Sequence, residues 1–147
     1  MKKEKQTIKK FAENAIQWAK EQTGSKAYPL RCLAFVEDAY EISNQIEMFG
    51  GSSAKESAEL YGTAHEGEPP LGAFVFYDTS GPVNGEMMDW GHVGLYIGDG
   101  KVIHAWGMVR VDRIEEIEQL RGAHGWKTPQ YFGWTAPEVF LKDYRAH

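Results

Sequence analysis

The sequence predicts an α+β domain in which one central helix packs against an antiparallel β-sheet. Most patterns typical of helices occur before residue 63, and most patterns typical of strands occur after residue 71. This separation is typical of α+β proteins, whereas alternating helices and strands would indicate a parallel sheet. With 147 residues, the chain can bury one core and is too short for two ordinary domains, so we predict one domain over residues 1–147.

Two helices are predicted at the start of the chain. From Lys5 to Thr23, apolar side chains recur every three or four residues, which indicates an amphipathic helix that ends at Gly24. A second helix is expected to start near Tyr28–Cys32, because proline is favoured in the first helical turn. Its apolar residues are Leu33, Phe35, Val36, Ala39, Tyr40, Ile42 and Ile46. They cover more than one face, so we predict that this is the buried central helix and that Cys32 lies in its first turn.

A short helix, a strand and two loops follow. Ser53 and Glu56 form a capping-box pattern that predicts the start of the helix. Residues 63–71 include two prolines and are predicted to form a surface loop. The apolar run 72–77 indicates a buried strand. The loop after it, residues 78–91, is longer than most connections in compact domains, so we expect it to bind a ligand.

Residues 90–106 are predicted to form a β-hairpin with an apolar face and a polar face. Apolar side chains alternate with small or polar ones along both strands, as in a sheet with one face against the core. The apolar face comprises Val93, Leu95, Ile97, Ile103 and Ala105. The polar face carries His92, Gly94 and His104. Gly94 is expected directly opposite His104, where it has no side chain to obstruct a close approach.

The turn of this hairpin decides whether the two histidines meet. We expect a three-residue loop, Gly98–Gly100, which places Ile97 opposite Lys101. His92 and His104 are then diagonal neighbours on one face, with Cβ atoms roughly 7–8 Å apart, which is within reach of two imidazole rings. A two-residue loop would shift the register by one and place His104 on the other face.

Three more elements complete the predicted domain. Residues 109–111 indicate a third strand beside the hairpin. Asp112 is expected to cap a helix that runs to Leu120. Residues 130–135 indicate a last strand after a loop rich in turn-forming residues.

Composition excludes several classes of function. The formal net charge is −5, and no Lys/Arg cluster occurs outside the first ten residues, which argues against nucleic acid or an anionic membrane as a partner. No apolar run approaches the roughly 20 residues needed to span a bilayer. An amphipathic segment follows the basic N-terminus in place of the apolar core of a signal peptide, so we expect a cytoplasmic protein. The oligomeric state is not predicted.

Cys32 is the strongest candidate for a reactive group. It is the only cysteine, which excludes an internal disulfide and suits a reducing compartment. A helix N-terminus or a nearby imidazolium lowers a cysteine pKa from about 8.5 to about 3.5–7.5. We therefore predict that Cys32 is a nucleophile, that His92 is its general base, and that His104 orients His92. This arrangement places the central helix across the histidine-bearing face of the hairpin.

Two other interpretations of these residues stay open. A lone cysteine in an apolar helix is commonly an inert core residue, and a histidine at a strand end is commonly a hydrogen-bonded structural group. A zinc site is chemically allowed, but the short ligand spacings typical of zinc are absent and no fourth ligand is evident, so no metal or cofactor is predicted. His65, His124 and His147 lack a comparable setting and are expected at the surface.

The chain resembles the NlpC-type peptidases, papain-fold cysteine peptidases that cut bacterial cell-wall peptides. The resemblance rests on the strand at 72–77 and on the hairpin motif HVGLYIGDGKVIHA, and it covers residues 28–106, a little over half of the chain. In that family the nucleophile is a cysteine at the start of the central helix, and the base is the histidine that opens the hairpin. The orienting residue, often histidine, follows 12 positions later. Cys32, His92 and His104 match these three positions in order, type and spacing.

The resemblance implies a papain-like fold and a hydrolase that cleaves an amide or isopeptide bond in a peptide through an acyl-enzyme, without a cofactor. It also implies a bacterial cell-wall stem peptide or fragment as substrate, which a phage-type enzyme can reach without a signal peptide. A CHAP-like amidase, an acyltransferase with the same site and a non-catalytic binding module on the same fold stay open as alternatives. The intact set of one Cys and two His argues against the binding module, since binding requires none of them.

The sequence departs from this family around the nucleophile. Family members usually have Asp-Cys-Ser-Gly there, and the Asp and Ser help to hold the free amino end of the wall peptide. This chain has Arg-Cys-Leu-Ala at residues 31–34. Arg31 would repel an ammonium and attract a carboxylate, so we expect an altered substrate preference. Tyr28, Trp90 and Trp106 are the other side chains expected to bind substrate, with Tyr28 in the place of an upstream tyrosine of the family.

Overall fold

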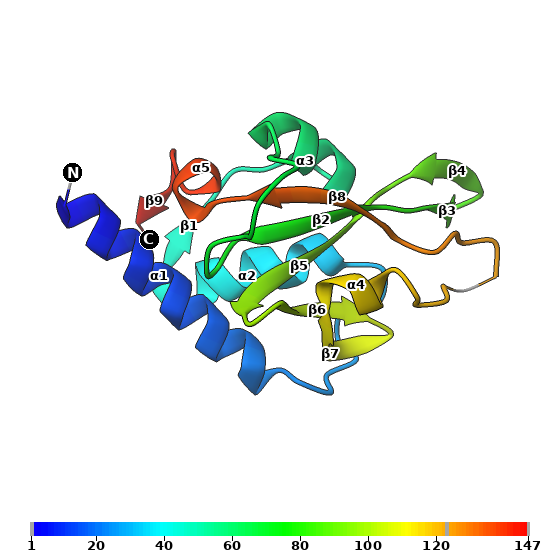
Figure 1. Cartoon of the computed structure of the whole chain (residues 1–147), viewed down its shortest axis with the longest axis horizontal. Coiled ribbons are helices and arrows are strands. Elements are labelled where there is room, and N and C mark those ends of the chain that lie inside the picture. The colour runs from blue at the N-terminus through cyan, green and yellow to red at the C-terminus, as the bar shows by residue number, and fades with distance from the viewer. Residues whose placement is uncertain (1, 123, 147) are drawn as a thin grey trace.

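The computed structural model describes residues 2–122 and 124–146, and it has the predicted α+β architecture (Figure 1). Five antiparallel strands form the main sheet in the order β7-β6-β5-β2-β8. They are β2 (Phe74–Asp78), β5 (His92–Gly98), β6 (Lys101–Trp106), β7 (Met108–Arg113) and β8 (Gln130–Thr135). Two smaller sheets pair β1 (Ile46–Glu47) with β9 (Arg145–Ala146), and β3 (Ser80–Val83) with β4 (Glu86–Asp89).

Helices lie on both faces of the main sheet (Figure 1). They are α1 (Lys2–Glu21), α2 (Cys32–Asn44), α3 (Ala54–Tyr61), α4 (Ile114–Ile117) and α5 (Pro137–Phe140). α2 packs against β5 and β6, α1 packs against α2, and α4 lies on the opposite face. Among the described residues, no helix is both long enough and apolar enough to cross a membrane.

Two apolar clusters join these layers, one on each face of the sheet. The larger cluster lies between α2 and the sheet and includes Phe35 and Val36 of the helix with Leu95 and Ile103 of the strands. The smaller cluster lies on the face of α4, and its buried residues are Ala73, Val75, Tyr77, Tyr96, Val102 and Ile117. Removal of both apolar surfaces from water is the main favourable term that holds the helices to the sheet.

The central helix is shorter than predicted. It begins at Cys32, after a turn that contains Pro29, and it ends before Gln45, which has a left-handed conformation with φ 52°. A residue in that conformation does not continue a right-handed helix. Ile46 therefore lies in β1, and Ile42 is 55% exposed, whereas both were expected to lie on the buried surface of the helix.

The starts of the two later helices differ in how well they were predicted. Ser53 caps α3 as expected, because its Oγ accepts a hydrogen bond from the backbone N–H of Glu56 over 3.1 Å. Asp112 does not cap α4, since it lies within strand β7. The backbone N–H of Arg113, the residue before α4, is instead bound by the carboxylate of Glu116 over 2.9 Å.

The segment 78–91, predicted to be a loop, contains a second hairpin. β3 and β4 are joined by the turn Asn84–Gly85, in which both residues have positive φ, 52° and 78°. Asn-Gly is the strongest short sequence signal for such a two-residue turn. The prediction was wrong because the flanking residues, among them Gly81 and Pro82, lack the alternation that identifies a strand.

The turn of the β5–β6 hairpin also differs from the prediction, while the register beyond it agrees. The turn is the two-residue segment Asp99–Gly100, with φ 54° and 73°, so Ile97 does not pair with Lys101. A β-bulge at Ile97 inserts one unpaired residue and restores the predicted pairing of Gly94 with His104. The two-residue turn and the bulge together have the same effect on the register as the expected three-residue loop.

Candidate active site

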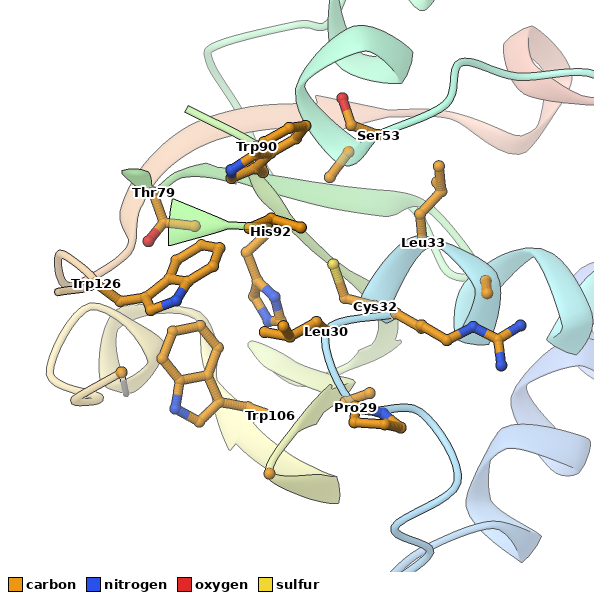
Figure 2. A pocket seen from close by; sticks show the side chains of 18 of the residues that line it. Pro29, Leu30, Cys32, Leu33, Ser53, Thr79, Trp90, His92, Trp106 and Trp126 are labelled. Carbon is orange, nitrogen blue, oxygen red and sulfur yellow. The ribbon is translucent and has the colours of Figure 1, made fainter. Parts of the chain in front are cut away.

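Cys32 and His92 meet at one end of the main sheet. Cys32 is the first residue of α2, and His92 is the first residue of β5. The prediction that α2 lies across the histidine-bearing face is wrong, because α2 covers the apolar face of the hairpin, where burial is favourable. The two side chains approach each other because both elements begin at the same end of the sheet. There the sulfur of Cys32 lies within reach of the backbone N–H of Val93, beside the His92 ring (Figure 2).

Four side chains form a continuous chain of hydrogen bonds that begins at His92. His92 Nε2 lies 2.8 Å from His104 Nδ1, and His104 Nε2 lies 2.8 Å from Asp112 Oδ2. Arg110 donates from Nε to Asp112 Oδ2 over 2.7 Å and from Nη2 to Oδ1 over 3.1 Å. The prediction that His92 and His104 share one face of the hairpin is confirmed. Both rings are buried, so little water competes for these hydrogen bonds.

The carboxylate at the end of this chain determines which ring nitrogens carry protons. An ionised carboxylate only accepts hydrogen bonds, so Nε2 of His104 carries a proton and Nδ1 of His104 is an acceptor. Nε2 of His92 must then donate to that acceptor. The other nitrogen of His92, Nδ1, holds a lone pair, and it is the nitrogen available to the thiol of Cys32.

Burial keeps both histidines neutral. It lowers the pKa of His92 well below the ordinary value of 6.5, and His104 lowers the pKa of His92 further. Burial also lowers the pKa of His104, although the hydrogen bond to Asp112 opposes this shift. For Asp112, burial alone would raise the pKa, but the hydrogen bonds from Arg110 and His104 lower it. At neutral pH the site therefore holds one ionised carboxylate and two neutral imidazoles.

The thiol of Cys32 is also neutral, in contrast to the predicted thiolate. Burial raises the pKa of Cys32 above its ordinary value of 9.0, and the backbone N–H groups of Val93, Leu33 and Cys32 offset only part of this shift. The prediction considered the helix dipole and a nearby imidazolium, whereas here the sulfur is desolvated and the imidazole carries no charge. The resting pair is thus a thiol and a neutral imidazole, and a proton must move when the sulfur attacks.

A cavity of about 860 Å³ opens beside Cys32 and His92. This volume is within the range of roughly 300–1,000 Å³ that is typical of ligand sites. Three of the residues predicted to bind substrate, Arg31, Trp90 and Trp106, line the cavity. Tyr28 does not line it, because its hydroxyl donates to Asp38 Oδ2 over 2.7 Å at the side of α2. Its position does not support the predicted contact with substrate.

Asp112 and Arg110 were not predicted as site residues. Strand β7 pairs with β6 so that Arg110 lies opposite His104, and strand alternation puts Asp112 on the same face, two residues further along. This signal is present in the sequence. It was missed because Asp112 also precedes a helical pattern and was interpreted as a helix cap. Trp126 lines the cavity and was also not predicted, because it comes from an irregular segment whose sequence has no period that would place it.

The hydrogen bonds of the two histidines argue against a zinc site. His92 Nε2 and His104 Nδ1 are hydrogen-bonded to each other, so neither nitrogen of this contact has a free lone pair for a metal. His104 Nε2 is bonded to Asp112. Within residues 2–122 and 124–146, no group of three or more His, Cys, Asp or Glu side chains is arranged to hold a metal ion.

Comparison with known proteins gives one match to a family and several to solved structures. A sequence model of the NlpC/P60 family matches residues 18–127. No curated protein matches this chain by sequence.

Three of the solved structures with a similar fold are described as NlpC or NlpC/P60 proteins. NlpC2 from Trichomonas vaginalis has a TM-score of 0.58 at 16% identity, over 86% of this chain and 46% of that chain. An NlpC/P60 family protein from Bacillus cereus has a TM-score of 0.59 at 17% identity, over 88% of this chain and 40% of that chain. NlpC1 from Trichomonas vaginalis has a TM-score of 0.53 at 18% identity, over 84% and 44% of the two chains. This chain therefore has the papain-like fold of these proteins and spans less than half of the length of each.

Proposed function

Since this chain belongs to the NlpC/P60 family, we propose that it is a cysteine hydrolase that cleaves an amide or isopeptide bond in a peptide. The first candidate substrate is a bacterial cell-wall stem peptide or a fragment of one. The observation that carries this proposal is the unbroken hydrogen-bond chain from Asp112 through His104 to His92, beside the thiol of Cys32. A site that only binds peptides has no need of a proton acceptor held in this way next to a nucleophile.

In the proposed reaction, Cys32 and His92 begin as a neutral pair. Nδ1 of His92 removes the thiol proton while the sulfur attacks the carbonyl carbon of the substrate, so the S–C bond and an imidazolium form together. The N–H groups of the first turn of α2 have no acceptor within the helix and are donors for the oxyanion. The C–N bond then breaks, and the amine leaves with the proton from His92.

Water completes the cycle. His92 removes a proton from a water molecule as its oxygen attacks the acyl carbon, and the C–S bond breaks. The sulfur regains its proton from His92, and the carboxylic acid leaves. Each turnover therefore consumes one water and returns both residues to their neutral forms.

His104 and Asp112 act through His92 in this proposal. Each half-reaction creates a buried imidazolium at His92, and burial disfavours that cation. The lone pair of His104 and the negative charge of Asp112 stabilise it, while the two hydrogen bonds from Arg110 hold the carboxylate in place. These residues position and polarise His92, and they do not contact the substrate.

The proposal is tested with a panel of purified cell-wall stem peptides, whose products are weighed by mass spectrometry. We expect one peptide to give two fragments whose summed mass exceeds that of the substrate by one water, and an early mass increase on Cys32 equal to the acid fragment less one water. The matched control is Cys32→Ala, which removes only the sulfur and should give neither signal. Cleavage by Cys32→Ala at the wild-type rate would overturn the assignment. An intact panel with an alkylatable thiol would rule out wall peptides as the substrate.

A further inference from the structure

We infer that the cavity beside Cys32 and His92 is a slot for an apolar acyl group of the substrate. This inference rests on the proposed hydrolase function and narrows its substrate class. Three tryptophans from separate segments surround the slot: Trp90 before β5, Trp106 at the end of β6 and Trp126 between α4 and β8 (Figure 2). Because the acyl group stays bonded to Cys32 in the intermediate, it must occupy this space.

The indole groups of Trp90 and Trp106 present carbon surfaces to the slot. Nε1 of Trp90 donates to the carbonyl oxygen of Gly81 over 2.9 Å, and Nε1 of Trp106 donates to that of Arg121 over 3.1 Å. Each of these rings has used its only hydrogen-bond donor within the protein. The ring of Trp106 also meets His92 edge to face, with centroids 5.0 Å apart. The apolar surface therefore reaches the reacting atoms.

Trp126 is held in place by its neighbours along the chain and by a glycine. A Cβ atom at Gly81 would overlap the Trp126 ring, so this close packing requires glycine at position 81. The next residue is also held in place, because the backbone N–H of Lys127 donates to the carbonyl oxygen of Ser80 in β3 over 2.9 Å. A bulky aromatic ring fixed over a glycine in this way is a preformed wall and not a freely moving side chain.

Two of the uncharged polar side chains that line the slot, Thr79 and Ser53, each make a hydrogen bond within the protein. Oγ1 of Thr79 donates to the carbonyl of Lys127 over 2.7 Å, and Oγ of Ser53 accepts from the N–H of Glu56 over 3.1 Å. His92 uses one nitrogen for His104 and is proposed to use the other for the thiol. A sugar ring or a polar side chain would thus lose its contacts with water and gain few new hydrogen bonds in return.

The charged groups of the cavity are compatible with an apolar occupant. Arg31 and Arg121 line the cavity but are exposed, so their charges remain in contact with water at the mouth. Glu37 is half-buried deeper along α2. Burial, with Glu41 and Asp38 nearby, raises the pKa of Glu37 to about 7, so this carboxyl is partly protonated at neutral pH.

Two p-nitrophenyl esters of equal chain length test this inference on the wild-type protein. One carries a hexanoyl group, and the other carries an adipoyl group, whose chain ends in a carboxylate. Acylation forms the S–C bond at Cys32, breaks the ester C–O bond and releases p-nitrophenolate, which is measured as a burst. Since one methylene in an apolar pocket changes specificity about 10–200-fold, we expect the hexanoyl ester to acylate Cys32 at least about 10 times faster. Equal rates, or faster acylation by adipoyl through the arginines, would overturn the slot.

Substitution of Trp126 gives a second, independent test. Each acylation rate is divided by the rate at which iodoacetamide alkylates Cys32 in the same variant, which corrects for changes in thiol reactivity. Trp126→Ala should lower the normalised preference for hexanoyl over adipoyl at least about fivefold, and Trp126→Phe should restore most of it. Met87→Ala, an exposed apolar residue outside the cavity, is the matched control and should leave the preference unchanged. An unaltered preference in Trp126→Ala would contradict the inference.

A ligand that cannot react separates the slot from the proposed chemistry. Hexanamide should protect Cys32 from iodoacetamide at concentrations at which adipamate, its analogue with a terminal carboxylate, does not. If neither ester acylates Cys32 but hexanamide protects it selectively, the hydrolase proposal fails and the apolar slot stands. If both esters acylate Cys32 equally and both amides protect equally, the slot fails and the hydrolase proposal stands.

Discussion

The β5–β6 and β3–β4 hairpins have the same kind of turn but differ in the packing of their strands. β5–β6 turns at Asp99–Gly100 and β3–β4 turns at Asn84–Gly85, and all four residues have positive φ. The strands of β5–β6 lie between two buried clusters, whereas β3–β4 extends beyond the main sheet and exposes Met87 and Met88 (Figure 1). The same turn therefore closes a hairpin that carries none of the side chains of the hydrogen-bond chain, and β3–β4 only supports the cavity wall through Gly81. In β5–β6, the bulge and the two covered faces set which side chains meet.

The largest contrast is expected between His92→Ala in β5 and Met88→Ala in β4. Loss of a positioned general base typically lowers a rate about 10²–10⁴-fold, so kcat/KM for the cleaved peptide should fall by that factor in His92→Ala. Met88 is exposed and lies outside the cavity, so Met88→Ala should stay within about twofold of the wild type. A His92→Ala variant that retains more than a tenth of the wild-type kcat/KM would remove His92 from the mechanism.

The next effect concerns the end of the hydrogen-bond chain. Asp112→Asn replaces a pure acceptor by a group that also donates, so it no longer determines the proton position on His104. Asp112 acts through His104, so we expect kcat to fall in Asp112→Asn by less than it does in His92→Ala. Asp112→Glu keeps the carboxylate and should retain more activity. The ¹⁵N chemical shifts of the His104 ring report its tautomer, and an unchanged tautomer in Asp112→Asn would limit Asp112 to a packing role.

A smaller contrast is expected between two glycines, Gly94 in β5 and Gly85 in the β3–β4 turn. A Cβ at Gly94 would clash with Val102 and lie 3.0 Å from the Cβ of His104, whereas a Cβ at Gly85 would meet open space. Gly94→Ala should therefore lower the free energy of unfolding by about 1–3 kcal/mol through overpacking and reduce turnover. Gly85→Ala should lower it by about 1 kcal/mol through its φ of 78° alone, with turnover unchanged. Urea denaturation measures both, and equal losses would show that the buried face tolerates a methyl group.

The smallest effect is a dependence of stability on pH that only β5–β6 should show. Burial lowers the pKa of His92 and His104, so below about pH 6.5 the unfolded chain binds more protons than the folded one. The contribution of the two neutral histidines to the free energy of unfolding is complete above that pH. It is lost as the pH falls, by up to about 1.4 kcal/mol per pH unit for each histidine. Glu37, whose pKa is raised to about 7, changes the stability with pH in the opposite direction. The quantity to compare is therefore the difference in slope between the wild type and a histidine variant. His104→Asn should lower the slope between pH 7.5 and 5.5, and an identical slope would contradict the neutral buried state.

Alternation of side chains predicted the part of the site that lies on one hairpin. It identified His92 and His104 as neighbours because their positions follow from the pleat and the pairing of two adjacent strands. It could not identify the contact with Cys32 correctly, because that contact depends on where a helix ends relative to a sheet. The helix was expected on the histidine face to bring the groups together, whereas its apolar surface packs on the other face and only its first residue reaches the site.

Local patterns were ambiguous where one residue type suits two roles. Asp112 fits a helix cap as well as a strand position facing His104, and only the third strand of the sheet distinguishes the two. The pKa of Cys32 was predicted in the wrong direction because burial is a property of the whole fold, whereas the helix dipole is visible from the local sequence. Trp126 enters the site through a segment with no period, so no pattern pointed to it.

The bulge at Ile97 makes the hairpin sensitive to the parity of its length. Two-residue turns pair positions whose numbers sum to an odd value, as Gly98 and Lys101 do, while the histidine face requires an even sum, as for Gly94 and His104. The unpaired residue of the bulge changes the odd sum of the paired residue numbers near the turn into the even sum found at the histidines. Deletion of Ile97 would therefore remove the bulge and keep Gly94 opposite His104, whereas the present chain without the bulge would place Leu95 opposite His104 and turn that imidazole to the other face.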